Sequence, residues 1–280
     1  MKSNNGVTPK SRTLYSQKPR IFISPHSLDE PPYGRITKSR IGSRYTVPWT
    51  KTKHHRKFIK RHGQFLNQGV LADADIFFWG EYEPETSCTI INQKTPKAVH
   101  DELTPVRGTT IPPGVLNTDP YVFGEHFKHI CCNIRNRKFQ PGDVILFGKV
   151  CKVKQQHFLS LDTVFVVKEK VLINPSLNMT QYYKASIEPL NNKKEYFYRG
   201  VNYATNNKYY SFVPCLLKYP PTSSQVTMPL LNLTSLGFDV KRGWYGFVAK
   251  TIQFSAGRWK KIIESVIKQG WLIGTHIDKV

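Results

Sequence analysis

Acidic residues are scarce in this sequence: 19 aspartates and glutamates stand against 41 lysines and arginines in 280 residues. The resulting formal charge of +22 excludes the acidic surface of an ordinary cytosolic enzyme. A surplus of this size favours a polyanionic partner, with nucleic acid ahead of an anionic membrane surface. We therefore expect a nucleic-acid-binding protein, and the charge does not distinguish DNA from RNA.

Long apolar runs and secretion signals are also missing. No stretch approaches the roughly 18 consecutive apolar residues of a membrane-spanning helix, so we expect no membrane partner. The first residues lack the apolar core of a signal peptide, which indicates a cytoplasmic protein. Hydrophobic residues still make up 39% of the chain, enough to bury a sizeable core and to exclude a wholly disordered protein.

The sequence has few of the residues and motifs that mark metal or catalytic sites. None of its five cysteines falls in a CxxC pair, so we predict reduced, mostly buried thiols, with a site of Cys131, Cys132, Cys151 and His129 as a weak alternative. No phosphate-binding P-loop, dinucleotide fingerprint, zinc-protease helix or hydrolase nucleophile elbow is present. We expect no metal and no cofactor.

Patterning predicts an α+β fold with a mainly antiparallel sheet. Residues 1–19 form an expected disordered basic arm, and residues 20–280 a single domain with an optional sub-boundary in the long loop 92–120. Strands are expected at 20–24, 144–148, 158–167, 196–199, 209–213 and 245–252. Apolar spacing predicts a helix over 256–269, capped by Ser255 and ended by Gly270.

The densest basic segment spans residues 35–62. Phe58, Ile59, Phe65 and Leu66 follow helical spacing, which predicts a helix with basic side chains on its exposed face. Cations along such a face can follow a phosphate backbone. The residues predicted to contact nucleic acid are Lys51, Lys53, Arg56, Lys57, Lys60 and Arg61. The alternative is an ordinary solvated face.

An aromatic and acidic segment follows at residues 76–83. Ile76–Trp79 is predicted to be a central strand, and Gly80 to permit a turn. Glu81 and Glu83 then share one face and can act as general base and helper, our catalytic candidates. Trp79, Tyr82 and Arg107 are the candidates for a base-binding pocket. The alternative is a core tryptophan beside surface acids.

Residues 140–167 resemble the PUA-like superfamily, which includes the ASCH and EVE domains. The resemblance lies in Pro141-Gly142-Asp143 with the apolar strand that follows it, and in the second strand over 161–167. It implies a PUA-like barrel, partly closed, with peripheral helices. Members of that superfamily bind RNA or modified DNA bases, often in an aromatic pocket.

The sequence thus predicts a nucleic-acid-binding protein whose aromatic and acidic pocket reads a base or nucleotide. Two alternatives stay open. One is a hydrolase or transferase acting on nucleic acid or a nucleotide through Glu81 and Glu83. The other is a basic structural or assembly protein without pocket chemistry. The sequence leaves the oligomeric state undetermined.

Overall fold

The computed structural model describes residues 18–25, 40–47, 56–81, 86–91, 98–100, 120–130, 138–173, 196–218, 228–239 and 251–278. Several sequence expectations lie outside these ranges. They are residues 1–17 of the basic arm, Lys51, Lys53, Tyr82, Glu83, Arg107, Cys131 and Cys132.

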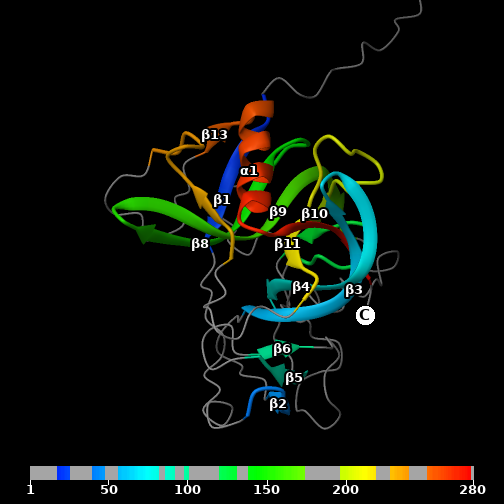
Figure 1. Cartoon of the computed structure of the whole chain (residues 1–280). Coiled ribbons are helices and arrows are strands. Elements are labelled where there is room, and N and C mark those ends of the chain that lie inside the picture. The colour runs from blue at the N-terminus through cyan, green and yellow to red at the C-terminus, as the bar shows by residue number, and fades with distance from the viewer. Residues whose placement is uncertain are drawn as a thin grey trace, which may run out of the picture.

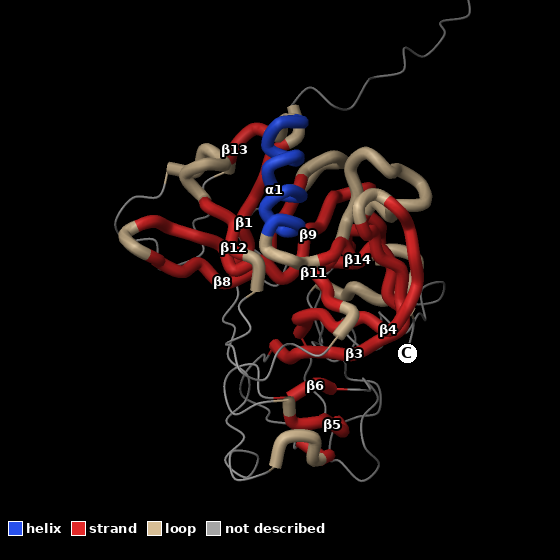
Figure 2. Tube along the Cα trace, in the orientation of Figure 1, coloured by secondary structure: helices blue, strands red, loops and turns tan. Residues whose placement is uncertain are grey.

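The described residues form two mixed β-sheets and one helix (Figure 2). Across the first sheet the order is β13 (Ile252–Gln253), β1 (Arg20–Pro25), β8 (Val144–Val153), β9 (Gln156–Leu172), β10 (Tyr196–Gly200) and β7 (Lys128–His129), with β12 (Leu230–Asn232) paired to β9. Across the second it is β14 (Leu272–Ile277), β11 (Val213–Leu216), β4 (Val70–Glu81), β3 (Arg56–Asn67), β6 (Ala98–His100), β5 (Thr86–Ile90) and β2 (Arg44–Val47).

The first sheet is built around the β8–β9 hairpin, whose two strands contain the segments predicted at 144–148 and 158–167. Lys154 and Gln155 make its two-residue turn with φ of 44° and 68°, the positive values that a tight hairpin turn needs. Alternate residues of β8 enter different core clusters, Val144 and Leu146 in one and Ile145 and Phe147 in the other. Both faces of this part of the sheet are therefore buried, which explains its continuous apolar run.

Part of the second sheet closes into a ring. β14 pairs with β11 at one side and with β3 at the other, so β3, β4, β11 and β14 form a closed antiparallel set. Close approach at Gly63 permits the closure, because a Cβ there would collide with the His276 carbonyl oxygen. Figure 1 shows β6, β5 and β2 continuing the sheet away from this ring.

The expected fold is confirmed in its coarser features and needs two corrections. A partly closed sheet is present, but each sheet also contains one parallel pair, β1–β8 and β3–β6, so the architecture is not purely antiparallel. The described residues contain a single helix rather than several, so this part of the chain is mostly β.

That helix, α1 (Ala256–Lys268), follows its prediction closely. The Ser255 side chain accepts a hydrogen bond from the Arg258 backbone N–H at 3.2 Å, and Gly270, with φ of 80°, follows the last turn. Trp259, Ile262 and Val266 are buried, and α1 packs against β12 and β14.

The helix expected over the basic segment is wrong, because residues 56–67 form strand β3. β3 pairs with β4 from Arg56↔Glu81 to Asn67↔Val70, around a turn at Gln68 and Gly69 with φ of 50° and 84°. The apolar residues that matched helical spacing lie on both faces of this buried strand. Long-range pairing therefore decides the local conformation here.

Other boundaries also shift. Gly80 does not turn the chain, because it lies inside β4 and pairs with Lys57. The strand expected at 209–213 begins only at Val213, and of the strand expected at 245–252 only Ile252, in β13, is both described and in a strand. Within the expected loop 92–120, residues 98–100 form β6.

Candidate nucleic-acid interface

Arg56 and Lys57, predicted to face solvent, are buried. Their exposed fractions are 1% and 3%. The Arg56 guanidinium (Nη1) lies 3.2 Å from an Asp162 carboxylate oxygen, and both side chains are almost fully enclosed. This ion pair joins β3 of the second sheet to β9 of the first. Its position gives it a role between the sheets rather than on a phosphate backbone.

A β-bulge places Asp162 at this contact. Phe147 pairs with Thr163 and Gly148 with Leu161, so Asp162 is the extra residue of the bulge in β9. A side chain at position 148 would collide with the Ser160 carbonyl oxygen, which accounts for glycine there. Bulges re-aim side chains, and this one directs a carboxylate to the buried Arg56 guanidinium.

Lys57 and His100 form a second buried polar group on the opposite face of β3. His100 is fully enclosed on β6, where it pairs with Ile59 of β3. Burial first, and the Lys57 charge second, hold the pKa of His100 well below its ordinary value.

The remaining predicted phosphate contacts on β3 are also engaged. The Lys60 ammonium lies 2.8 Å from an Asp75 carboxylate oxygen. Arg61 is half-buried. Burial raises the pKa of Tyr121 to about 12, and the charge of Arg61 partly opposes that rise. The dense basic run therefore supplies little open cationic surface along β3.

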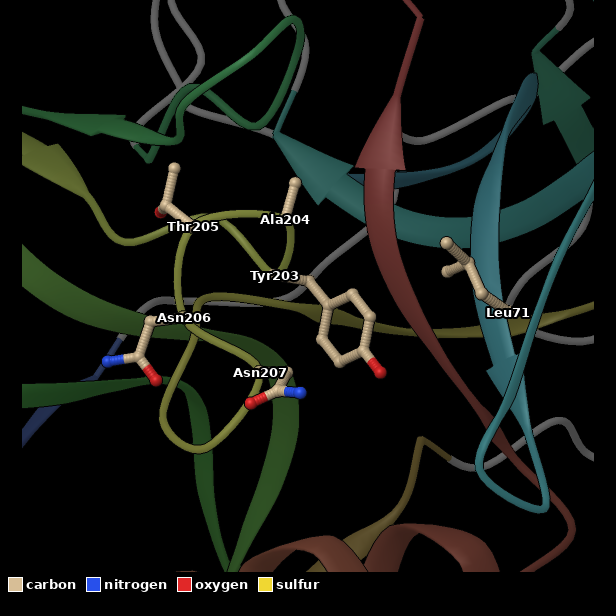
Figure 3. Close-up of a pocket in the computed structure, with 6 residues that line it drawn as sticks. All are labelled: Leu71, Tyr203, Ala204, Thr205, Asn206 and Asn207. Carbon is tan, nitrogen blue, oxygen red and sulfur yellow. The ribbon is translucent and has the colours of Figure 1, made fainter.

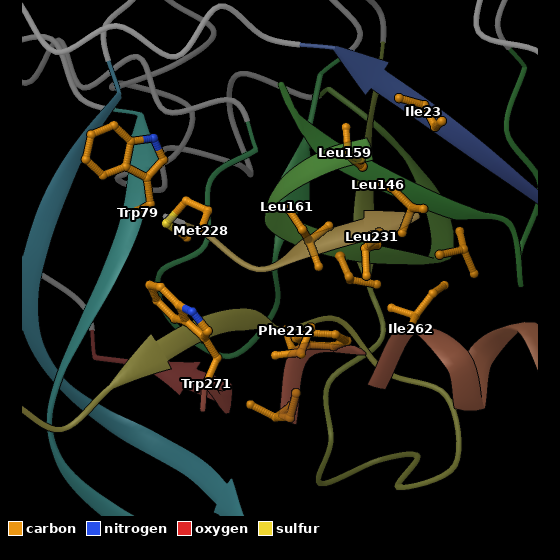
Figure 4. Close-up of a cluster of buried hydrophobic side chains, with 14 of the residues drawn as sticks. Ile23, Trp79, Leu146, Leu159, Leu161, Phe212, Met228, Leu231, Ile262 and Trp271 are labelled. Atoms are coloured by element: carbon orange, nitrogen blue, oxygen red, sulfur yellow. The ribbon is translucent and has the colours of Figure 1, made fainter. Parts of the chain in front are cut away.

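Trp79 lies in the hydrophobic core rather than at an open wall. It is 3% exposed, its ring centroid is 6.4 Å from that of Phe58, and it belongs to the same cluster as Met228 and Trp271 (Figure 4). Glu81 is the last residue of β4 and pairs with Arg56 of β3. With Tyr82, Glu83 and Arg107 outside the described residues, the catalytic and base-pocket assignments stay predictions.

Three exposed lysines that the sequence analysis did not single out lie on the β8–β9 hairpin. Lys149, Lys152 and Lys154 are exposed in its outer part, residues 149–157, which we call the hairpin tip. The sequence contains no acidic residue from position 144 through 161. Our sequence reasoning missed these lysines because three cations spread over six residues look unremarkable beside the run at 51–61. The absence of acidic residues from positions 144–161 was the sequence signal that could have identified these lysines.

Hydrogen bonds connect the hairpin tip to α1. The Asn232 amide donates to the Gln156 side chain at 3.0 Å, while Lys261 of α1 donates to the Ser235 carbonyl oxygen at 2.9 Å. Gln269, just after α1, bonds the Leu230 backbone in both directions. Residues 230–237 thus bridge the two elements, as Figure 1 shows.

The loop over residues 203–210 flanks α1 on its other side (Figure 1). Tyr209 and Tyr210 pack edge-on against Trp259, each with 5.7 Å between ring centroids. Lys208 is exposed, and its ammonium lies 5.4 Å from the centroid of the Tyr209 ring. We call the hairpin tip, α1 and this loop together the basic strip.

Charge on the basic strip is almost entirely positive. Its basic residues are Lys149, Lys152, Lys154, Lys208, Arg258, Lys260, Lys261 and Lys268. Glu264 is the only acid in these segments, and it lies 3.8 and 4.0 Å from Lys260 and Lys268. Such exposed pairs on a helix contribute little to stability. The surface carries the cations that phosphate contact requires.

A cavity of about 480 Å³ opens beside this surface (Figure 3). Tyr203, Ala204, Thr205, Asn206 and Asn207 of the loop line one side, and Leu71 of the β3–β4 hairpin lines the other. The lining combines an aromatic ring, an aliphatic side chain and amide groups, with no ionised side chain.

In the part of the chain that the structure describes, no group of three or more histidines, cysteines and acids lies close enough together to hold a cation. Burial raises the pKa of the Cys151 thiol above its ordinary value, and the charge of Lys149 partly opposes that rise. Within the same described ranges, no helix is both long and apolar enough to cross a membrane.

Searches against protein-family models, curated proteins and solved structures find no match to this chain.

Proposed function

We propose that the protein binds nucleic acid through the basic strip. The observation that carries this proposal is the hairpin tip, where three exposed lysines project in a segment of 18 residues, 144–161, without an acid. Phosphate contacts require cations spaced along a surface and little else, and they dominate the affinity of nucleic-acid-binding proteins.

Two further features support the same function. Lysines of α1 and Lys208 extend the positive surface beyond the hairpin, so several phosphates can be contacted together. A two-stranded β-ribbon also has the dimensions to enter a DNA major groove. The resemblance of residues 140–167, which include this hairpin, to PUA-like domains agrees with the proposal.

The test is the salt dependence of binding to labelled single- and double-stranded oligonucleotides, measured by fluorescence anisotropy. Replacing Lys149, Lys152 and Lys154 together by alanine is expected to weaken binding and to flatten the plot of log K against log salt. For three lost contacts on a single strand, the slope falls by about 2.

A charge-matched control is available at the opposite end of β9. Lys138, Lys168 and Lys170 are exposed there, and replacing them by alanine removes the same charge from the other side of the first sheet. We expect this variant to bind almost as the unaltered protein does. Equal losses in the two variants would show diffuse charge attraction and would contradict a defined interface on the basic strip.

A further inference from the structure

One wall of the cavity beside the basic strip, the Tyr203 ring, packs against a neighbouring aromatic side chain. The Tyr203 ring meets Tyr210 edge-on, with 4.9 Å between centroids, and Tyr210 packs in turn against Trp259 of α1. In Figure 3 the Tyr203 ring extends from the loop in the direction of Leu71. The ring therefore stands as a fixed platform at the cavity.

Backbone capping makes the loop a defined structure. The Asn202 side-chain oxygen accepts from the Thr205 N–H at 2.9 Å, and the Asn206 side-chain oxygen accepts from Lys208 and Tyr209 at 2.9 and 3.2 Å. These bonds use the oxygen of Asn206, and its amide nitrogen remains as a donor. The exposed Asn207 amide adds a donor and an acceptor.

The lining chemistry specifies the kind of ligand. A cavity without an ionised side chain suits a neutral group, an aromatic wall suits a flat one, and amides suit a ring with hydrogen-bonding edges. A nucleobase has all three properties. The cavity, largely open to solvent, has a volume of about 480 Å³, within the roughly 300–1,000 Å³ of small-molecule sites.

The neighbouring charge specifies how the base arrives. Lys208 follows the lining residues directly, and α1 with its exposed lysines lies next to the loop. A base in the cavity would thus carry its phosphates toward cations. A base inside a duplex is stacked and paired and cannot present its face to Tyr203.

We propose that the Tyr203–Asn207 cavity takes an unpaired base of single-stranded nucleic acid, stacked on Tyr203 and contacted at its edge by Asn207. The inference rests on the proposed function, because the basic strip would hold the phosphates on either side. It adds a preference for unpaired strands, which phosphate contacts alone do not supply.

The experiment compares an oligodeoxythymidylate with an abasic strand of equal length and equal charge, at fixed salt. The protein is expected to bind the base-bearing strand more tightly. Y203A is expected to weaken that binding by roughly 5- to 150-fold, the range for loss of one stacked base, and to leave the abasic strand almost unaffected. Y203F keeps the ring and is expected to retain the preference.

Controls separate stacking from folding. Y196A removes a partly buried tyrosine from β10, outside the basic strip, and is expected to keep the preference. If Y203A melts well below the unaltered protein, N207A decides instead, since its side chain is exposed. Loss of an edge contact there is expected to reduce the preference by about 2- to 10-fold.

The outcomes distinguish this inference from the proposed function. Equal, salt-dependent binding of the two strands by the unaltered protein overturns the base site and leaves the phosphate interface standing. A retained preference in folded Y203A, or in N207A where Y203A does not fold, also overturns the base site. Binding of neither strand at low salt overturns both proposals.

Discussion

Removing the charge of Asp162 is expected to destabilise the protein strongly. The replacement D162N keeps the shape of the side chain but removes the carboxylate charge that lies 3.2 Å from the Arg56 guanidinium, which is 1% exposed. At the observed 3.2 Å, the attraction in an effective dielectric of 20 is about 5 kcal/mol. Breaking one side of a buried pair typically costs about 3–5 kcal/mol, because the remaining charge stays desolvated.

A second variant separates the net value of the ion pair from the cost of breaking it. The double replacement R56M/D162L fills the same space with apolar groups and removes both charges of the pair, so its stability is expected to be close to that of the unaltered protein or above it. The free energy of unfolding is measured by urea titration with tryptophan fluorescence. A loss below about 1 kcal/mol in D162N would refute the reasoning, since Arg56 would then have found solvent or another counter-ion.

Two further predictions concern the core and pH. I262A removes a fully buried side chain of α1 and is expected to lower the free energy of unfolding, measured in urea, by about 2–5 kcal/mol. I267A, at a side chain that is 47% exposed, is expected to lower it by less than about 0.5 kcal/mol. Similar losses in the two variants would mean that α1 packs by another face. The pKa of His100 is lowered in the folded protein, so below its ordinary pKa of about 6.5 the unfolded chain binds more protons and stability falls as pH decreases. Between pH 6.5 and 5, the stability of H100Q is expected to fall less steeply than that of the unaltered protein, by up to about 1.4 kcal/mol per pH unit. The free energy of unfolding of both proteins is measured by urea titration at several pH values. The same pH dependence in the two proteins would contradict the prediction.

Much of the fold follows from local patterns where these agree with long-range pairing. The β8–β9 hairpin and α1 were predicted because β-branched and aromatic runs in the one, and helical spacing in the other, were bounded by the turn or cap residues they require. The β3 strand was missed because its apolar residues occur in adjacent pairs, such as Phe58 and Ile59, which fit a helix as well as a strand buried on both faces. The closing of β14 onto β3 carries no local signal, since the partners lie about 210 residues apart.

The candidate interface was harder to predict because charge density in sequence differs from open charge in space. Arg56 and Lys57 belong to the densest basic run, yet the core encloses them. Their burial depends on Asp162 and on the contact between β3 and β9, neither of which the basic run itself indicates. Lys208 and the α1 lysines are brought near the hairpin tip only by the packing of α1 between residues 230–237 and the loop.

The placement of the few acids explains why the basic strip is the better candidate. Asp143 and Asp162 are buried against Arg20 and Arg56, where they hold β1 and β3 to the rest of the fold. Asp75 meets Lys60, so β3 has its charges balanced where they reach the surface. The hairpin tip has no acid in its own sequence neighbourhood. The chain carries a net charge of +22, and at the hairpin tip exposed lysines occur in a segment, 144–161, that contains no acid, the combination that favours phosphate contact.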